Sequence, residues 1–496
     1  MISKICLIIP PSGFLLDERV FMSLGILKVA SVLEQAGIVV EVLDLSGVSN
    51  YPEVVEDYVV NSDVRVFGIT ATTPQLPPAV LILQIIRRIK PRARVILGGP
   101  HVTLMNSARK YEIRKGKIGR ATGAIEVLRG IFNILVSGDG ERAIFEALKF
   151  DASKMVDADE PHTENKLLLT SNDLEELPLP ARHLVDVDSY HYSIDGERAL
   201  SLIAQLGCPF SCGFCGGRTS PSFRRIRTRS TENVVAEMKY LYIKYGVKGF
   251  MLYDDELNVN IKMVELMRAI KRVQVELGVE WKLRGFIKAE LFTHEQAEAM
   301  KEAGFKWILV GFESGSKKIL QNINKKATRE ENTRAMKIAH EHGLKVKALM
   351  SIGHPGESLE TIEETLAWLI EAKPDDFDIS IITVYPGTPY YNEAVLEDGK
   401  WVYTYEKTGD RLYQVDVDYT TVANYYKGNP DGGYHAYVST DYLSAEDLVR
   451  ERNRVEHEVR AKLNIPFSHS APAMMYEHSM GQSGVFPSNI LRVSKL

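Results

Sequence analysis

Short apolar runs rich in β-branched residues alternate with amphipathic stretches over the first 150 residues. Apolar positions that repeat every three or four residues indicate helices, and short apolar runs bounded by glycine or proline indicate buried strands. The first such helix carries Leu24, Leu27, Ala30 and Leu33, and it is expected to end at Gly37, because glycine readily takes the left-handed conformation that closes a helix. The predicted strands are 4–9, 39–43, 66–69, 94–97 and 131–136. The alternation predicts an α/β fold whose first domain, residues 1–150, is a Rossmann-like, doubly wound parallel sheet.

The same alternation returns after residues 151–195, a stretch rich in Asp, Glu and Pro that we interpret as a linker. Six further strands are predicted, at 200–206, 249–253, 281–286, 307–311, 346–351 and 378–384. Six βα units are too few for a closed eight-stranded barrel, so residues 196–391 are expected to form a partial (β/α)6 barrel. Residues 107–130 are basic and contain no clear strand, and residues 392–496 are expected to form a small C-terminal domain.

Aromatic residues crowd the start of this C-terminal region. Tyrosine joins an apolar face to a hydroxyl group, so the segment is expected either to wall a pocket for a flat or amphipathic substrate or to form the core of the small domain. A helix is predicted to begin after Ser444, because Asp447 can complete a capping box with it. The aromatic residues are Trp401, Tyr403, Tyr405, Tyr413, Tyr419, Tyr425, Tyr426, Tyr434, Tyr437 and Tyr442.

The composition of the 496-residue chain, 45% hydrophobic and 25% charged, is that of an ordinary globular protein. Its net charge of -5 does not favour general attraction to nucleic acid or to an anionic membrane. The basic run from Arg224 to Arg229 is therefore interpreted as pairing with cofactor carboxylates or as solvated, and not as an RNA site. The apolar run near the start is too short for a signal peptide or a membrane span and is expected to be the first strand.

Three of the four cysteines, Cys208, Cys212 and Cys215, stand in a Cys-x-x-x-Cys-x-x-Cys spacing. An odd number of clustered thiols does not suit disulfide bonds. A closed zinc site would need a fourth ligand, but Cys6 lies far upstream and the nearest downstream histidine is His294. A 4Fe–4S cluster with one open iron therefore fits better than the alternatives, a zinc site or a purely structural cluster.

Glycine, proline and hydroxyl residues follow the predicted strands of the first domain, in the loops 10–13, 70–74, 98–101 and 138–141. The carboxyl ends of parallel strands meet at one edge of a sheet, where such folds bind their cofactors. The loops alone would also fit an ordinary nucleotide site, but no Gly-x-Gly-x-x-Gly follows the first strand.

With Phe214 before its last cysteine, the cysteine motif resembles the signature of the radical S-adenosylmethionine (SAM) superfamily. The first domain, with Gly98-Gly99-Pro100-His101 and Gly138-Asp139-Gly140-Glu141, resembles the cobalamin-binding domain of many such enzymes. The resemblance implies a 4Fe–4S cluster on the three cysteines, SAM on the open iron, and cobalamin at the strand-end loops. Asp-x-His-x-x-Gly is lacking, and the resemblance therefore implies cobalamin held without its benzimidazole on cobalt and without a histidine ligand. The cobalamin-binding residues that it implies are Pro11, Ser12, Leu24, Thr70, Thr72, Thr73, Gly98, Gly99, His101, Gly138 and Glu141.

The resemblance also implies SAM contacts around the barrel rim. Asp254 or Asp255 would lie near the SAM amino group, Arg284 would bind its carboxylate, and Glu313 would bind its ribose. For the two aspartates, the plainer alternative to a SAM contact is a solvated acidic turn. For Arg284 and Glu313, it is an ion pair between the two side chains. The full implied set is Phe214, Asp254, Asp255, Arg284, Glu313, Ser314, Gly353 and Pro386.

Taken together, the resemblance predicts a cytoplasmic, cobalamin-dependent radical SAM methyltransferase. It would use a 5′-deoxyadenosyl radical and methylcobalamin to methylate an unactivated carbon of a small molecule or natural product. An external one-electron donor such as flavodoxin or ferredoxin is implied, with no nucleic-acid partner and no membrane span. The alternatives are a non-methylating oxidative cyclase or ring-contraction enzyme, an iron–sulfur or cobalamin carrier, and an RNA methylthiotransferase. The last would need three more cysteines in the first domain, where only Cys6 is present.

Overall fold

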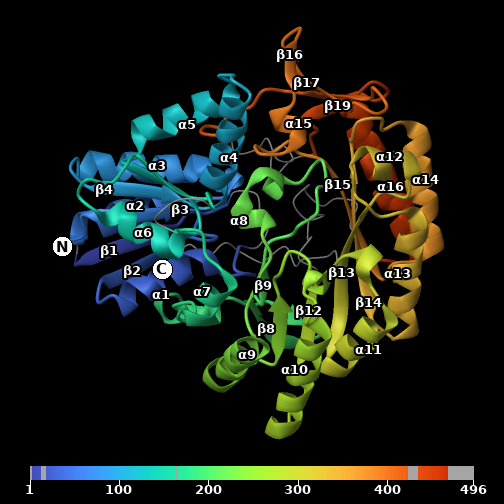
Figure 1. The fold of residues 1–496 in the computed structure, drawn as a ribbon, viewed down its shortest axis with the longest axis horizontal. Coiled ribbons are helices and arrows are strands. Elements are labelled where there is room, and N and C mark those ends of the chain that lie inside the picture. The colour runs from blue at the N-terminus through green and yellow to red at the C-terminus, as the bar shows by residue number, and fades with distance from the viewer. Residues whose placement is uncertain (1–2, 13–17, 162–165, 423–433, 467–496) are drawn as a thin grey trace.

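The computed structural model describes residues 3–12, 18–161, 166–422 and 434–466. Two parallel sheets, each covered by helices, lie side by side, with the short helix α8 (Pro221–Arg224) between them (Figure 1). No helix among these residues is both long and apolar enough to cross a bilayer.

The first sheet contains six parallel strands in the order β2-β1-β3-β4-β5-β6, which confirms the predicted doubly wound fold. Helices α1 and α6 cover one face, and α2, α3, α4 and α5 cover the other. The strands are β1 (Lys4–Ile9), β2 (Val39–Asp44), β3 (Val66–Thr70), β4 (Arg94–Gly98), β5 (Ile134–Gly138) and β6 (Met155–Ala158). The helices are α1 (Leu24–Gln35), α2 (Tyr51–Asn61), α3 (Leu76–Ile89), α4 (Pro100–Arg114), α5 (Arg120–Ile131) and α6 (Gly140–Leu148).

Two details of this sheet differ from the sequence prediction. Strand β6 lies within the stretch interpreted as a linker, because its four residues are alternately buried and give little apolar signal. The basic stretch 107–130 forms the second half of α4 and most of α5, and no strand interrupts it.

The second sheet has the order β15-β14-β13-β12-β11-β8-β7. Its six predicted parallel strands are confirmed, and a short antiparallel strand, β7, extends its edge. The sheet curls into a partial barrel with helices outside. The strands are β7 (Ser193–Ile194), β8 (Glu197–Leu202), β11 (Gly249–Leu252), β12 (Lys282–Ile287), β13 (Phe305–Glu313), β14 (Lys345–Ile352) and β15 (Asp376–Ile381). The main helices are α9 (Thr231–Tyr245), α10 (Met263–Leu277), α11 (His294–Ala303), α13 (Arg329–Glu341) and α14 (Leu359–Ala372), and the short ones are α7 (Ser171–Glu176), α12 (Lys317–Asn322) and α15 (Pro389–Asn392).

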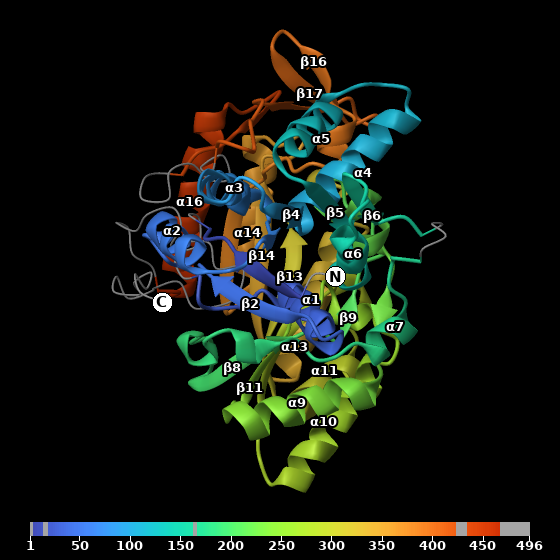
Figure 2. The ribbon, with the colours of Figure 1, turned by 90° about the vertical axis from the view of Figure 1, so that its left-hand side faces the viewer.

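The C-terminal region contains a four-stranded antiparallel sheet and helix α16 (Ala445–Leu463). The sheet consists of β16 (Val395–Glu397), β17 (Lys400–Thr404), β18 (Arg411–Gln414) and β19 (Val438–Thr440). As predicted, Ser444 caps α16 and accepts a hydrogen bond from the Asp447 N–H at 3.1 Å. In Figure 2 the β16–β17 hairpin projects beside α4 and α5 of the first domain.

Helix α16 covers the open edge of the barrel. Arg452 Nε donates to the Ile379 carbonyl at 3.0 Å, and Arg460 Nη2 donates to the Phe377 carbonyl at 2.8 Å. These carbonyls belong to β15, the edge strand of the sheet, and no strand of the described residues pairs with its outer edge. Part of the region expected to be a separate small domain is therefore built onto the barrel.

Candidate functional site

The loop that carries Cys208, Cys212 and Cys215, here called the cysteine loop, leaves the barrel rim after β8. It is closed at its base by a short antiparallel pair, β9 (Gln205–Leu206) and β10 (Arg227–Thr228). Gly207, with φ +87°, begins the loop, and a Cβ there would lie 2.1 Å from the Arg225 carbonyl oxygen, so only glycine fits. Arg224 donates to the carbonyl oxygens of Pro209 at 2.6 Å and Phe210 at 3.2 Å. The loop is therefore held in shape by protein groups.

The loop is also braced on the side of α12. The Gly213 N–H donates to the Ile323 carbonyl at 2.7 Å, and Asn324 Nδ2 donates to the Ser211 carbonyl at 2.8 Å. Phe214 packs on His354 with ring centroids 5.4 Å apart. These contacts fix the backbone that carries the three thiols.

The three cysteines form a donor set that fits a 4Fe–4S cluster. Cys208 and Cys215 line one cavity of about 330 Å³, and Cys212 is buried behind them. Burial raises the pKa of Cys208 to about 12 and also raises that of Cys212, so a bound cation is needed to keep these thiols ionised. Among the described residues, no three Cys, His, Asp or Glu side chains could hold a single metal ion.

Cys6 lies apart from this group. It is fully buried in β1 of the first sheet, where its neighbours are apolar side chains.

Two buried lysines lie beside the cysteine loop, and sequence reasoning missed both. Lys288 follows β12, forms an ion pair with Glu290 at 2.7 Å, and lies 4.2 Å from the Phe210 ring centroid. Lys325 Nζ lies 3.2 Å from Glu313 Oε1. Their positive charges lower the pKa of Cys212 against the effect of its burial. Lys288 could have been found from its place at the carboxyl end of a strand, whereas the place of Lys325 depends on a loop that the sequence does not define.

The adjacent carboxylates after β11 have different surroundings. Asp254 Oδ1 accepts from the N–H groups of Ala204 at 2.7 Å and Gln205 at 2.6 Å, and burial raises its pKa to about 7. Asp255 Oδ2 accepts from the Gly207 N–H at 3.1 Å, and Asp255 lines the cavity with Cys208 and Cys215. Asp254 thus fixes the strand ends, and Asp255 faces the space beside the cysteines.

Glu313 ends the fourth parallel strand, β13, and Ser314 follows it. Glu313 has a φ of +68°, and its Oε2 accepts from Ser351 Oγ at 2.8 Å. The Ser314 hydroxyl is 3.0 Å from that of Thr365 and is buried. Of the two, Glu313 forms an ion pair with a buried lysine near the cysteine loop, Lys325.

The remaining implied SAM contacts lie in different places. Arg284 lies 5.3 Å from the ring of Trp307, whose indole N–H donates to Asp195 at the turn before β8, so the structure does not bring Arg284 to the cavity. Gly353 packs against the barrel core. Pro386 is buried in the loop after β15, next to Tyr385, which lines the cavity.

The first domain supplies the opposite wall of the same cavity. Thr72, Thr73, Pro74 and Pro100 line it together with Cys208 and Cys215. Gly99 lets the loops that follow β3 and β4 approach each other, since a Cβ there would lie 2.6 Å from Thr70 Oγ1. The strand-end loops implied for cobalamin thus face the cysteine loop across this cavity.

Among the residues that the structure describes, no histidine lines this cavity. His101 is buried between the first domain and the C-terminal segment, with Nδ1 3.1 Å from Thr73 Oγ1 and its ring centroid 6.0 Å from that of Tyr419. Burial lowers its pKa to about 3, so it is neutral at physiological pH.

Other implied cobalamin residues do not line the cavity. Ser12 ends the described part of its loop and donates its N–H to Glu18 at 2.6 Å, whereas Gly13 lies outside the described residues. Glu141 lies beside Asp139 and Lys28, and burial followed by the Asp139 charge raises its pKa to about 7. Gly138 packs against the end of β6, with the Ala158 carbonyl carbon 2.5 Å from where its Cβ would lie. The others outside the cavity wall are Pro11, Leu24, Thr70, Gly98 and Gly99.

The aromatic C-terminal segment lines a second cavity, of about 1050 Å³. Its walls include Trp401, Tyr403 and Tyr405, together with Gly213 and Arg218 of the cysteine region. Tyr434 is instead buried in the barrel core, so the segment supplies both pocket wall and core. Tyr425 and Tyr426 lie outside the described residues.

Comparisons with known proteins match both domains. The radical SAM superfamily model matches residues 202–369, and the B12 binding domain model matches residues 18–129. The first range contains the cysteine loop, and the second contains the loops after β3 and β4.

Relatives and solved structures extend these matches. An uncharacterised methyltransferase of Pyrococcus horikoshii is 28% identical, over 80% of this chain and 84% of its own. The anaerobic magnesium-protoporphyrin IX monomethyl ester cyclase of Cereibacter sphaeroides is 27% identical over 68% of this chain, which spans only 54% of the cyclase. The radical SAM methyltransferase TsrM from Kitasatospora setae, solved with cobalamin and a [4Fe–4S] cluster, has a TM-score of 0.64 at 19% identity, over 95% of this chain and 92% of its own. The likeness to TsrM shows that the two proteins share a fold.

Proposed function

Because the chain belongs to the radical SAM superfamily and carries a B12-binding domain, we propose that it is a cobalamin-dependent methyltransferase that acts on an unactivated carbon of a small molecule. The two domains imply a 4Fe–4S cluster, SAM and cobalamin as cofactors. The observation that carries the proposal is the cavity shared by Thr72, Thr73 and Pro100 of the first domain and by Cys208 and Cys215 of the second.

The chain's own residues would hold the cofactors on opposite walls of this cavity. Cys208, Cys212 and Cys215 would hold the cluster, and the loops after β3 and β4 would hold cobalamin. When bound, the cluster and SAM supply a 5′-deoxyadenosyl radical, and methylcobalamin supplies the methyl group. The protein's contribution is to orient these groups and to exclude water from a reactive site.

For SAM, we propose contacts from Phe214, Asp255 and Glu313. Asp255 is a carboxylate on the cavity wall and suits a positively charged amino group. Glu313 is held by Lys325 and Ser351, and each of its oxygens keeps one further lone pair for a ribose hydroxyl. The role of Arg284 as a ligand of the SAM carboxylate stays a prediction. Lys288 is a cation that lies nearer the cysteine loop, beside Phe210.

The larger cavity is the proposed entry for the substrate. Its aromatic walls suit a flat or amphipathic small molecule, and Gly213 and Arg218 connect it to the cysteine loop. We also propose that a one-electron donor such as flavodoxin or ferredoxin reduces the cluster.

Turnover with SAM carrying a deuterated methyl group tests the proposal. The reduced, cofactor-loaded protein should form 5′-deoxyadenosine, S-adenosylhomocysteine and a deuterium-labelled product from a pool of small molecules. The cyclase relative favours one second candidate, a non-methylating radical reaction. Formation of 5′-deoxyadenosine without any transfer of the labelled methyl group would support that candidate instead.

A further inference from the structure

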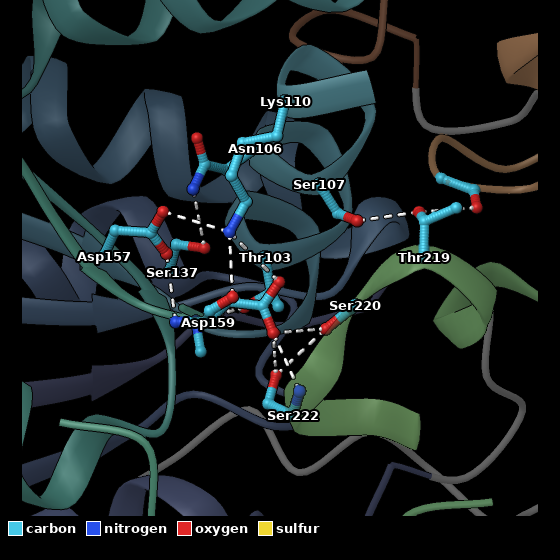
Figure 3. Close-up of polar contacts among 12 residues, drawn as sticks. Thr103, Asn106, Ser107, Lys110, Ser137, Asp157, Asp159, Thr219, Ser220 and Ser222 are labelled. Atoms are coloured by element: carbon cyan, nitrogen blue, oxygen red, sulfur yellow. Dashed lines mark hydrogen bonds and ion pairs between the residues drawn. The ribbon is translucent and has the colours of Figure 1, made fainter. Parts of the chain in front are cut away.

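Two aspartates, Asp139 and Asp159, follow neighbouring strands of the first sheet and hold the segment that leaves the cysteine loop. Figure 3 shows the contacts of Asp159. Asp159 follows β6, and its Oδ1 accepts hydrogen bonds from Ser220 Oγ at 2.6 Å, Ser222 Oγ at 2.7 Å and the Ser222 N–H at 2.8 Å. Asp139 follows β5 and forms an ion pair with Arg227. Residues 219–229 of the barrel are thereby docked on the carboxyl edge of the first sheet.

The Asp159 contact is deeply buried. Its side chain has no exposed surface, and Lys110 of α4 supplies the opposite charge, 3.6 Å from Asp159 Oδ2 and 3.1 Å from Asp157 Oδ2. Lys110 also donates to the Asp159 carbonyl at 2.8 Å. Replacing buried ionic groups by apolar ones is often neutral for stability, so stability alone does not account for this network. Such a network does fix one relative position of the two surfaces that it joins.

Helix α4 makes a second link to the same segment. Its first residue, Pro100, lines the cavity. Leu104 packs on Gly216, the residue after Cys215, and a Cβ on Gly216 would lie 3.2 Å from it. Ser107 Oγ lies 2.7 Å from Thr219 Oγ1 (Figure 3). One helix therefore runs from the loop proposed for cobalamin to the residues that follow the last cysteine.

The carboxyl edge of the first sheet is thus divided between two tasks. The loops after β3 and β4 line the cavity. The ends of β5 and β6 carry Asp139 and Asp159, which bind the barrel. A change at Asp139 or Asp159 would therefore move the cysteine loop relative to the loops after β3 and β4.

We propose that Asp159 and Asp139 are positioning residues that set the separation and orientation of cobalamin relative to the 4Fe–4S cluster. The inference rests on the proposed function, because it requires both cofactors on one chain. Neither residue touches the cavity; each acts through the segment 219–229.

Asp159→Asn tests this inference with little change in shape. The magnetic interaction between cob(II)alamin and the one-electron-reduced cluster, recorded by electron paramagnetic resonance (EPR) of frozen solution, reports their separation. We expect equal iron and cobalt contents in parent and variant, but a weaker or broader interaction in the variant. Ser31→Ala is the matched control, because Ser31 is a buried serine of α1 that donates to Lys28 within its own helix at 2.8 Å. A variant spectrum identical to that of the parent would overturn the inference.

Hydrogen–deuterium exchange of peptides covering residues 216–229 gives a readout that does not need cobalamin. Exchange should be faster in Asp159→Asn than in the parent, and unchanged in Ser31→Ala. If Asp159→Asn does not fold, Ser222→Ala removes one hydroxyl donor and keeps the buried charge, and it should increase exchange in the same peptides. Unchanged exchange would overturn the inference, whereas a parent protein that binds no cobalamin would contradict only the proposed function.

Discussion

Lys325 Nζ lies 3.2 Å from Glu313 Oε1, beside the cysteine loop and away from solvent. Only 5% of the Lys325 side chain and 13% of the Glu313 side chain is exposed. The pair therefore places a neutralised carboxylate at the end of β13, where its second oxygen accepts from Ser351. Removing one member leaves the other charge buried without its partner.

The first prediction concerns this pair. Glu313→Gln should lower the stability of the protein by about 3 to 5 kcal/mol, because a buried ammonium loses its counter-charge. It should also weaken SAM binding by about tenfold or more, since a charge-assisted hydrogen bond contributes roughly 1.5 to 3 kcal/mol. Thermal denaturation and SAM titration of the cluster-loaded protein measure the two effects.

The double variant Glu313→Gln/Lys325→Met separates the effect on stability from the effect on SAM binding. It should regain part of the stability, because the Lys325 ammonium no longer lies buried without the Glu313 carboxylate, but it should not regain SAM affinity. Recovery of both properties would show that Glu313 has no role in SAM binding.

The second prediction concerns the cluster. Cys208→Ala, Cys212→Ala and Cys215→Ala should each lose the cluster and the cleavage of SAM, because three thiolates hold it. Cys6→Ala is the control, since Cys6 is fully buried in the first sheet. Iron analysis and absorption spectra of anaerobically prepared protein check both outcomes. A full cluster in any of the three variants would refute the assignment.

The third prediction concerns the helix that covers the barrel edge. Arg460 is buried, forms ion pairs with Asp376 and Glu456, and donates to the Phe377 carbonyl. Arg460→Met should therefore destabilise the protein by about 3 to 5 kcal/mol. Arg450→Met on the same helix should cost about 1 kcal/mol or less, because Arg450 is 62% exposed. Equal melting temperatures of the two variants would contradict the proposed role of α16.

The fourth prediction concerns pH. Burial raises the pKa of Glu357 to about 7, so the folded protein keeps this proton where the unfolded chain has already lost it. Stability from this group is full below pH ~4.3 and is lost as the pH rises towards 7. Glu357→Gln cannot ionise, and its melting temperature should fall less between pH 5 and pH 8 than that of the parent.

The difference for Glu357→Gln corresponds to up to about 3 kcal/mol at pH 8. The exposed Glu360, three residues further on in the first turn of α14, is the control, and Glu360→Gln should follow the parent at both pH values. A parallel pH dependence of parent and Glu357→Gln would place the ionisation elsewhere.

The strands and the cysteine loop could be predicted from the sequence because each depends on local signals. Apolar runs mark buried parallel strands, and the spacing of Cys208, Cys212 and Cys215 limits the ligands that they can hold. Strand β6 could not be predicted in this way, since four alternately buried residues give no clear run.

Side-chain directions and contacts between domains could not be predicted. The sequence places Arg284 on a strand but does not tell that it lies beside Trp307, away from the cavity. Asp139 and Asp159 follow strands as ligand-binding residues do, yet they bind Arg227 and two serines of the barrel. Such pairings depend on how the domains meet.

EPR of the cob(II)alamin form, together with iron and cobalt analysis, tests the central claim most directly. The claim is that one chain holds a 4Fe–4S cluster and cobalamin on opposite walls of one cavity, with no protein imidazole on cobalt. We predict about four iron atoms and one cobalt atom per chain. We also predict cobalt lines without nitrogen splitting, because the benzimidazole of cobalamin is expected to be off cobalt, His101 is buried against Thr73, and no histidine is among the described residues that line the cavity. A clear nitrogen splitting, or folded protein that binds no cobalamin, would contradict the account.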